Sequence, residues 1–354
     1  MTQFKRLSRR QLIRATGASA AFVAAPQILR QTAEAQEQTL FVNTWGGSWT
    51  AAEETAYFKP FTEKTGIKVR TVAPVSFAKL KAQVQSKVYE WDVSNAGVVE
   101  YSQAVVEGLL EPVDKSIVDP AKFPPGNVVD YGVAGVSLGT CLVYRKDKFP
   151  NGGPQSWADF WDVKKFPGNR SLYNRSFTNL AFALLADGVP ADKLYPMDLD
   201  RAFKKLDQIK PHIKVWWTQG NQSQQLIQDG EVDMIAMWNA RAQEMIDRGS
   251  PFQIVWNGAE NYGGYWYVPK GAPRAKLAFQ FLEFVSQPKP QADFVNILPY
   301  GPPHPKAFDF ISKETASKMP TAPDNLRVSH VPDANWLAPR LPEIRERFSQ
   351  WLAS

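Results

Sequence analysis

Apolar and polar positions alternate along the first third of the chain in the order of strands followed by helices. A short apolar run at residues 39–43 predicts a strand, and residues 51–65 have the spacing of a helix that stops at Gly66. The next expected elements are a strand at residues 67–75, a helix capped by Ser76, a short strand at residues 91–94 and a helix near residues 101–109. This order predicts an α/β fold with crossover connections on a largely parallel sheet.

Prolines interrupt this order at residues 111–130, and residues 133–145 then have the pattern of one long strand that enters a second region. That region alternates again: its expected strands are residues 171–174, 213–217 and 232–238, and its expected helices are residues 156–161, 179–186, 199–209, 222–228 and 240–247. Residues 252–269, rich in glycine and aromatic residues, form a second passage, and helices near residues 278–285 and 341–351 follow it.

Two passages between two regions mean that neither region is contiguous in sequence. We therefore predict a two-lobed protein, with residues 36–135 and 258–300 in lobe 1 and residues 136–257 and 301–354 in lobe 2. Connections of this kind leave a hinge between the lobes, and we expect a ligand cleft at that hinge.

The amino-terminal segment indicates where the protein works. Residues 1–35 combine the pair Arg9-Arg10, a mildly apolar run at residues 15–29 and an A-x-A pattern that ends at Ala35. This combination is typical of a twin-arginine export signal cleaved near Ala35, and the alternative is a basic amphipathic anchor or a cytoplasmic tail. No later stretch reaches the roughly 20 apolar residues that span a bilayer. We therefore expect export by the twin-arginine machinery and a soluble periplasmic protein.

The net charge of +6 comes mostly from the same segment. Residues 1–35 hold six of the 41 basic residues and one of the 35 acidic residues, so the rest of the chain carries 35 basic residues against 34 acidic ones. A nearly neutral chain lacks the basic stripe that captures nucleic acid, and we expect no nucleic-acid partner.

Motifs for catalysis and for metal binding are weak in this sequence. Residues 135–139 match the G-x-S-x-G pattern of α/β hydrolases around Ser137, but residues 140–145 continue as a strand where that mechanism needs a helix. No two of the three histidines have metal-ligand spacing, and the single cysteine, Cys141, excludes an intrachain disulfide and a CxxC site. We predict no catalytic residue, no metal and no cofactor, with a secreted serine hydrolase as the alternative.

Aromatic side chains at the ends of predicted strands are the candidates for ligand binding. The turn after the first strand holds Gly46 and Gly47 between Trp45 and Trp49. Trp45 and Trp238 each end a predicted strand and precede a helix, and open α/β sheets bind ligands at that edge. Trp49 lies one helical turn later and is expected in the core. The remaining aromatic candidates are Tyr262, Tyr300 and Trp336.

Six short motifs occur in an order that is found in a known family. They are Lys64-Thr65-Gly66-Ile67-Lys68-Val69, residues 76–80, Trp91-Asp92-Val93, Ser156-Trp157-Ala158-Asp159, residues 229–239 and Leu298-Pro299-Tyr300-Gly301-Pro302. In this order they resemble the extracellular solute-binding proteins of ABC importers, and within them the spermidine/putrescine-binding branch. The resemblance implies a hinged periplasmic protein, expected as a monomer, that closes on a small-molecule ligand and presents it to a membrane permease.

The resemblance transfers aromatic positions better than charged ones. The positions that match stacking residues of polyamine receptors are Trp45, Trp238, Tyr262 and Tyr300. The carboxylates that pair with ammonium groups in those receptors fall here at Arg175, Thr178 and Gly264, and a glutamine falls at Leu337. A diammonium ligand without a carboxylate partner would be desolvated at a cost of several kcal/mol for each charge.

Basic residues instead favour an acidic group on the ligand. Arg175 and Arg241, together with the backbone N–H groups of Gly46, Gly47 and Ser48 at a helix start, suit a carboxylate or a similar anion. The alternatives are a solvated surface position for Arg241 and a structural ion pair for Arg175.

The expected ligand is therefore a small polyamine-like organic solute that bears an amine or is zwitterionic. Its flat or amine-bearing part would lie between aromatic walls, and its acidic group near Arg175. A true spermidine/putrescine receptor is the alternative, which requires that Asp92, Glu100 or Glu260 reaches the cleft.

Overall fold

The computed structural model describes residues 38–354 of the chain. The export signal predicted at residues 1–35 lies outside the described residues. Within residues 38–354, no helix combines the length and the apolar content that a membrane crossing needs.

The first described elements form a parallel strand pair with a helical crossover. In chain order they are β1 (Thr39–Asn43), α1 (Ser48–Glu53), the π-helical η1 (Glu54–Phe58), α2 (Lys59–Thr65), β2 (Lys68–Val72), α3 (Phe77–Ser86), β3 (Ser94–Gly97) and α4 (Val98–Val106). β1 pairs parallel with β2, and α2 ends at Gly66, whose φ of 75° is left-handed. The hydroxyl of Ser76 accepts the Lys79 N–H and begins α3, as predicted.

The prediction of a largely parallel sheet is wrong for the rest of this lobe. β3 belongs to a four-stranded sheet in the order β3, β11, β5, β4, and its other strands are β4 (Val128–Val129), β5 (Gly132–Ala134) and β11 (Gly264–Tyr267). All three pairings are antiparallel. β11 returns from the second lobe and enters beside β3 in the opposite direction, which the local pattern of either strand does not encode.

The single strand predicted at residues 133–145 is in fact two strands. β5 ends at Ala134, and β6 (Leu138–Arg145) begins after a three-residue break. Two backbone hydrogen bonds fix the chain at this break. The Ser137 N–H donates to the Gly301 carbonyl at 2.7 Å, and the Gly301 N–H donates to the Ser137 carbonyl at 2.9 Å. β6 follows Ser137 directly, so the helix that a hydrolase nucleophile turn requires is missing here.

The second lobe is built on a five-stranded sheet in the order β10, β6, β9, β7, β8. Its other strands are β7 (Arg170–Tyr173), β8 (Ile213–Trp217), β9 (Met234–Trp238) and β10 (Phe252–Tyr262). β7 is parallel to β8 and β9, whereas β6 is antiparallel to β9 and β10. The passage expected at residues 252–269 is therefore mostly strand: β10 remains in this sheet to Tyr262, and β11 starts at Gly264. The lobe boundaries at residues 135/136 and 257/258 stay a prediction.

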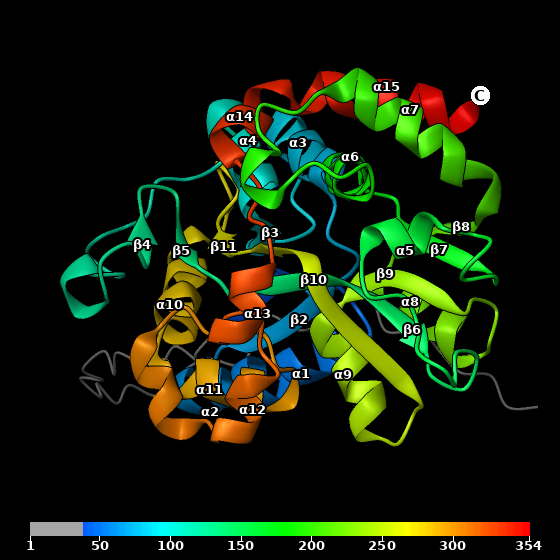
Figure 1. Ribbon diagram of the computed structural model, residues 1–354. Coiled ribbons are helices and arrows are strands. Elements are labelled where there is room, and N and C mark those ends of the chain that lie inside the picture. The colour runs from blue at the N-terminus through cyan, green and yellow to red at the C-terminus, as the bar shows by residue number, and fades with distance from the viewer. Residues whose placement is uncertain (1–37) are drawn as a thin grey trace, which may run out of the picture. The chain divides into compact units, whose positions relative to one another are not determined.

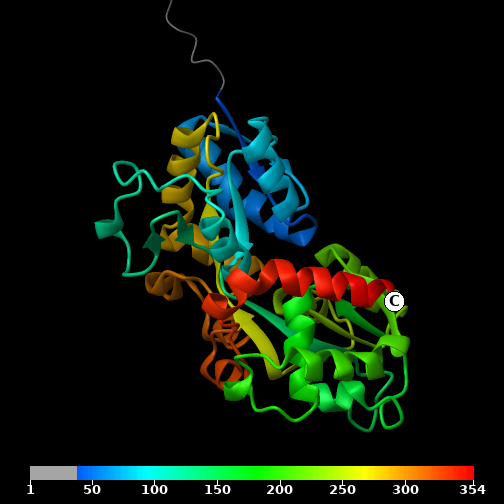
Figure 2. The ribbon, with the colours of Figure 1, turned by 90° about the horizontal axis from the view of Figure 1, so that it is seen from above.

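Helices cover the faces of these sheets (Figures 1 and 2). The α-helices after α4 are α5 (Trp157–Trp161), α6 (Ser176–Ala186), α7 (Leu199–Ile209), α8 (Gly220–Gln228), α9 (Asn239–Asp247), α10 (Ala275–Val285), α11 (Pro288–Ile297), α12 (Lys313–Ser317), α13 (Pro323–Val328), α14 (Ala334–Leu337) and α15 (Leu341–Ala353). Short 3₁₀ turns lie at η2 (Pro120–Lys122), η3 (Ala191–Lys193), η4 (Lys210–His212), η5 (Pro305–Phe310) and η6 (Ala338–Arg340). Figure 1 shows α6, α7 and α15 together on one side of the five-stranded sheet and α9 on its other side.

The apolar core extends across both lobes. The largest cluster of buried apolar side chains includes Leu40 of the first lobe and Trp217 of the second, so packing is continuous from one lobe to the other. A second cluster surrounds α6, where Trp157 stacks on Phe182 with 3.7 Å between ring centroids. Burying a side chain of this size stabilises the fold by about 1.5–3 kcal/mol.

Candidate ligand-binding site

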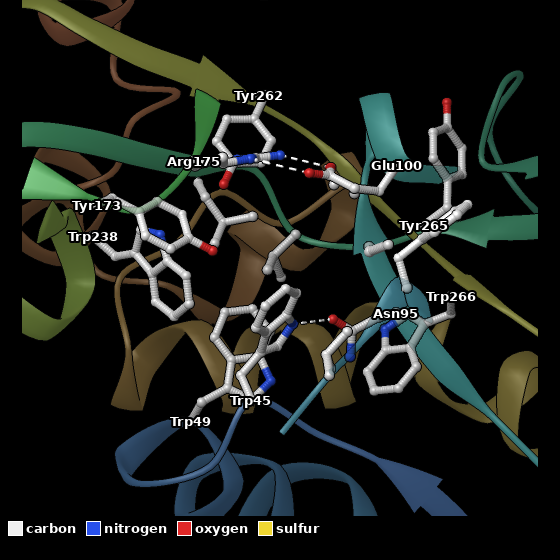
Figure 3. A pocket seen from close by; sticks show the side chains of 18 of the residues that line it. Trp45, Trp49, Asn95, Glu100, Tyr173, Arg175, Trp238, Tyr262, Tyr265 and Trp266 are labelled. Atoms are coloured by element: carbon white, nitrogen blue, oxygen red, sulfur yellow. Dashed lines mark hydrogen bonds and ion pairs between the residues drawn. The ribbon is translucent and has the colours of Figure 1, made fainter. Parts of the chain in front are cut away.

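A cavity of about 350 Å³ lies between the two lobes, at the edge where several strands end. Figure 3 shows most of its side chains converging from both lobes. Its lining residues are Trp45, Trp49, Tyr57, Val75, Phe77, Asn95, Ala96, Gly97, Glu100, Gly135, Val136, Leu138, Tyr173, Asn174, Arg175, Ser176, Trp238, Tyr262, Gly264, Tyr265, Trp266, Tyr267, Phe294, Arg345, Phe348 and Ser349. Four of the ten predicted site residues are among them: Trp45, Arg175, Trp238 and Tyr262.

Trp45 forms one wall of this cavity. It lies two residues after the end of β1, and the left-handed φ angles of Gly46 (77°) and Gly47 (59°) then turn the chain into α1. Its indole N–H donates to Oδ1 of Asn95 at 2.5 Å. Its ring packs edge-on against Trp238, with 5.5 Å between centroids. The turn from Trp45 to Trp49, called the tryptophan turn below, therefore brings a tryptophan of the first lobe into contact with a tryptophan of the second lobe.

Trp238 ends β9 and belongs to an aromatic group of the second lobe. It packs edge-on against Tyr173 at 5.8 Å and against Trp217 at 5.7 Å, and Tyr173 stacks on Trp217 at 4.1 Å. Sequence reasoning missed Tyr173, although it ends β7 as Trp238 ends β9. The same strand-end criterion would have identified it. Tyr265 and Trp266 were also missed, because their segment was interpreted as a passage instead of β11.

A charged cluster lies at one side of the cavity. Nε and Nη2 of Arg175 contact the two carboxylate oxygens of Glu100 at 3.1 and 2.6 Å, and its Nη1 lies 3.6 Å from Oε1 of Glu260. Arg345 approaches Glu100 at 3.6 Å, and the Thr178 hydroxyl donates to Glu260 at 2.9 Å. All three nitrogens of Arg175 therefore face carboxylates, so its charge is already compensated.

The charges of this cluster respond to burial in opposite ways. Burial raises the pKa of Glu260 to about 7, although the Arg175 guanidinium and the Thr178 hydroxyl lower it. Burial lowers the pKa of Arg175, but Glu100, Tyr262, Glu260 and Tyr173 together outweigh this effect and leave that pKa raised well above its usual value. Arg175 therefore stays charged, whereas Glu260 changes its charge near neutral pH.

The structure separates the three acids that the polyamine alternative invoked. Glu100 lines the cavity. Glu260 is fully buried and lies behind Arg175, outside the lining. Asp92 is buried elsewhere and pairs with Arg274 at 2.7 Å. One carboxylate thus reaches the cavity, and it is shared with two guanidinium groups.

Arg241 and the start of α1 do not line the cavity, and their role as ligand residues stays a prediction. Arg241 is fully buried rather than on the surface, and it donates to the Gly46 carbonyl at 2.9 Å and to the Ser48 hydroxyl at 3.3 Å. A third bond joins it to Gln224 at 3.0 Å. The expected anion seat at Gly46, Gly47 and Ser48 is therefore in contact with an arginine of the other lobe.

Tyr300 and Trp336 are also absent from the lining. Tyr300 is fully buried and packs on Trp49 with 5.0 Å between centroids. Trp336 is half-buried and packs on Tyr195 at 5.7 Å, with the Arg340 guanidinium 5.0 Å from its ring. Both are structural residues of their own lobes in this conformation.

Trp49 is a core residue, as predicted, with 3% of its surface exposed, and one edge of it reaches the cavity. Its indole N–H donates to the fully buried Glu53 at 2.6 Å, and the Thr44 hydroxyl donates to the same carboxylate. Burial raises the pKa of Glu53 to about 8, and the two hydrogen bonds and the charge of Arg241 lower it only partly. A carboxyl group that is mostly neutral at pH 7 therefore anchors Trp49.

Metal ligation has no candidate site in residues 38–354. No group of three or more histidine, cysteine, aspartate or glutamate side chains there could hold an ion. The chemistry of the cavity is that of aromatic rings, the amides of Asn95 and Asn174 and a compensated charge cluster.

The sequence is similar to those of known binding proteins. The bacterial extracellular solute-binding protein family matches residues 56–323. The γ-aminobutyric acid-binding protein of Pseudomonas aeruginosa is 40% identical over 330 residues, which cover 91% of this chain and 93% of that protein. The spermidine/putrescine-binding periplasmic protein of Salmonella typhimurium is 24% identical over 80% of this chain and 83% of its own.

Solved structures of binding proteins have a similar fold. The binding protein AgtB from A. tumefaciens R10, in complex with agropinic acid, is 33% identical and superposes with a TM-score of 0.85 over 90% of this chain and 99% of its own. A solved γ-aminobutyric acid receptor is 35% identical, with a TM-score of 0.79 over 89% of this chain and 98% of its own. The two-lobed α/β fold and the resemblance to solute-binding proteins of ABC importers are confirmed. The chain belongs to the bacterial extracellular solute-binding protein family.

Proposed function

We propose that this protein is the periplasmic receptor of an ABC importer, without enzymatic activity, and that it captures a small zwitterion of the γ-aminobutyrate type. The observation that carries the proposal is the cavity of about 350 Å³, whose aromatic walls come from both lobes and which meets one compensated charge cluster. A cavity of that size lies at the small end of ligand sites. The similarity to γ-aminobutyric acid-binding proteins supports this ligand class.

A polyamine fits the charges of the cavity less well than a zwitterion. Glu100 is the carboxylate of the lining, but Arg175 lies 2.6 Å and Arg345 3.6 Å from its oxygens. The two ammonium groups of putrescine would therefore share one carboxylate that already faces two cations. A ligand with one ammonium and one carboxylate adds no net charge to a buried site, so its desolvation is easier to compensate.

Contacts across the cleft support a closed conformation. Trp45 of the first lobe meets Trp238 of the second, and Arg175 of the second lobe pairs with Glu100 of the first. A ligand between these pairs touches both lobes at once only when the hinge is closed. Its binding energy would thus shift the equilibrium toward the closed state that a permease recognises.

Calorimetry on the mature protein tests the function. γ-Aminobutyrate should bind with one site per monomer and more tightly than putrescine or spermidine. Trp45→Ala should weaken that binding at least about tenfold through the loss of ring contacts, whereas the control Trp336→Ala, at a half-buried site outside the cavity, should not. Tight binding of spermidine or putrescine without binding of γ-aminobutyrate would establish the polyamine receptor instead.

We also propose that the twin-arginine machinery exports the chain, that cleavage occurs near Ala35, and that the mature protein is a monomer. The pair Arg9-Arg10 and the A-x-A pattern support the export route. Mass spectrometry of the periplasmic protein would give the cleavage site, and light scattering its mass. Replacing both arginines by lysine should leave the uncleaved precursor in the cytoplasm. Periplasmic mature protein from that variant would contradict the route.

A further inference from the structure

The wall of the cavity is not equally buried on all sides. Trp49 and Trp238 each have 3% of their surface exposed, whereas Asn174 and Ser349 are exposed to solvent. All lining residues belong to the described part of the chain, and these two are the exposed ones among them. Solvent therefore reaches the cavity beside α15, the carboxy-terminal helix that carries Ser349.

The two lobes face each other at this place. Arg345 lies one helical turn before Ser349 on α15 and also lines the cavity. Its guanidinium carbon lies 5.4 Å from the ring centroid of Phe77, the first residue of α3. Phe77 and the nearby Val75 are half-buried and line the cavity from the first lobe. We call the opening bounded by Val75, Phe77, Arg345 and Ser349 the mouth of the cavity.

Arg345 joins α15 to α4 of the first lobe beside the mouth. Its Nη1 donates to Oε1 of Gln103 at 2.9 Å, and its Nη2 lies 3.6 Å from Oε1 of Glu100. Gln103 has 5% of its surface exposed and does not line the cavity, and its amide also donates to Glu107 at 2.7 Å. One side chain of the second lobe thus contacts three side chains of the first lobe where the cavity opens.

The helix that carries Arg345 is anchored on the second lobe. Phe348 packs on Trp216 of β8 with 5.9 Å between ring centroids, and Arg347 donates to Asp200 of α7 at 2.6 Å. Figure 2 shows α15 along the second lobe with its amino-terminal end next to the first lobe, where η6 lies against α4. Because α15 moves with the second lobe, separation of the lobes breaks the contacts of Arg345.

We propose that the ligand enters and leaves through the mouth beside α15, and that Arg345 is a clasp that holds α4 to α15 and so slows ligand release. Arg345 acts as a positioning residue, because its contacts to Phe77, Glu100 and Gln103 exist only when the lobes are closed. Contacts that form after the ligand has entered change the dissociation rate more than the association rate. The ligand used in the test rests on the proposed function. The clasp itself joins protein side chains, so it also favours closure of the ligand-free protein.

Stopped-flow tryptophan fluorescence with γ-aminobutyrate measures both rates, because Trp45 and Trp238 line the cavity. Arg345→Gln should raise the dissociation rate constant about tenfold and change the association rate constant by less than about twofold. Gln103→Leu removes one bond of the clasp without altering the lining and should raise the dissociation rate constant about threefold. Arg347→Gln is the matched control on the same helix. It removes a bond within the second lobe and should leave both rates unchanged.

A bulky label at the mouth tests the route. Ser349→Cys labelled with a large maleimide should slow association and dissociation by a similar factor, because an obstacle hinders passage in both directions. The same label on Gln350→Cys is the control, since Gln350 is exposed but does not line the cavity. The native Cys141 is fully buried and should not react. Unchanged rates for labelled Ser349→Cys would overturn the route.

A distance measurement tests the clasp without any ligand. Spin labels on Gln85→Cys of α3 and Gln350→Cys of α15, both exposed, report the separation of the lobes. Adding Arg345→Gln should shift the ligand-free protein toward longer distances, whereas adding Arg347→Gln should not. Thermal melts establish that each variant folds, and if Arg345→Gln does not, Gln103→Leu takes its place in both measurements.

The outcomes separate the clasp from the proposed function. If the wild type binds γ-aminobutyrate and Arg345→Gln leaves the dissociation rate unchanged, the clasp is wrong and the function stands. If the wild type binds no amino acid, the function is wrong and the distances decide. Longer distances in Arg345→Gln then support the clasp, and unchanged distances overturn it.

Discussion

Glu53 is a fully buried carboxyl group beneath the tryptophan turn, and Glu53→Gln should remove much of the pH dependence of stability above pH 5. The amide oxygen of glutamine can accept the Trp49 N–H, and the amide group can donate to the Thr44 hydroxyl, which has a second partner in Thr50. The substitution therefore imitates the protonated acid with little change of shape.

The sign and size of the effect follow from the pKa of Glu53. Burial raises it from 4.5 to about 8, so the folded protein keeps a proton that the unfolded chain releases above pH 4.5. The stabilisation is fully present below pH 4.5 and is lost as the pH rises toward 8. One pKa unit corresponds to about 1.36 kcal/mol, and the integrated loss between pH 5 and pH 8 is on the order of 3.5 kcal/mol. For a chain of this size that corresponds to roughly 5 °C in Tm.

Thermal unfolding of the ligand-free protein at pH 5 and pH 8 measures this effect. Other titrating groups contribute equally to wild type and variant, so the difference between their Tm shifts isolates residue 53. Glu54→Gln, at the adjacent and more exposed carboxylate, is the matched control and should follow the wild type. Equal Tm shifts for the wild type and Glu53→Gln would refute the reasoning.

Three further predictions test the hinge, the core and the cysteine. Arg241→Lys should weaken ligand binding about tenfold in calorimetry. Lysine lacks the guanidinium group, so the variant loses hydrogen bonds that join α9 to the Gly46 carbonyl across the cleft. An unchanged affinity would exclude that role. Phe182→Ala should lower the free energy of unfolding in urea by about 3–5 kcal/mol, because the ring that stacks on Trp157 is fully buried, while ligand affinity at low temperature stays the same. Cys141 should resist alkylation in the native protein, because it is fully buried and burial raises its pKa; modification as fast as in the unfolded chain would contradict this.

The sequence was informative wherever local pattern decides the outcome. Trp45 and Trp238 were identified because each lies between a strand and a helix, Trp238 at the end of β9 and Trp45 two residues after β1, and both line the cavity. Gly66 and Ser76 ended and began helices for reasons of backbone conformation and capping that act within a few residues. Such features need no knowledge of the partner strand.

The sequence failed where a residue's role depends on the other lobe. Arg241 was expected on the surface or at a ligand, yet it bonds to the Gly46 carbonyl, a residue 195 positions away. Arg175 lies in the cavity, but its compensation by Glu100 and Glu260 could not be read from spacing. The direction in which β11 enters its sheet is likewise fixed by the return path, which no local pattern records.

That return path also governs when the protein can fold during synthesis. β11 is the neighbour of both β3 and β5, and it extends to Tyr267 of the 354 residues. Until this strand has left the ribosome, β3 and β5 have no central partner, and both remain as unpaired edges. Contacts of such long sequence separation form late and slowly. The amino-terminal lobe, although synthesised first, must therefore wait for most of the second lobe before its own sheet can close.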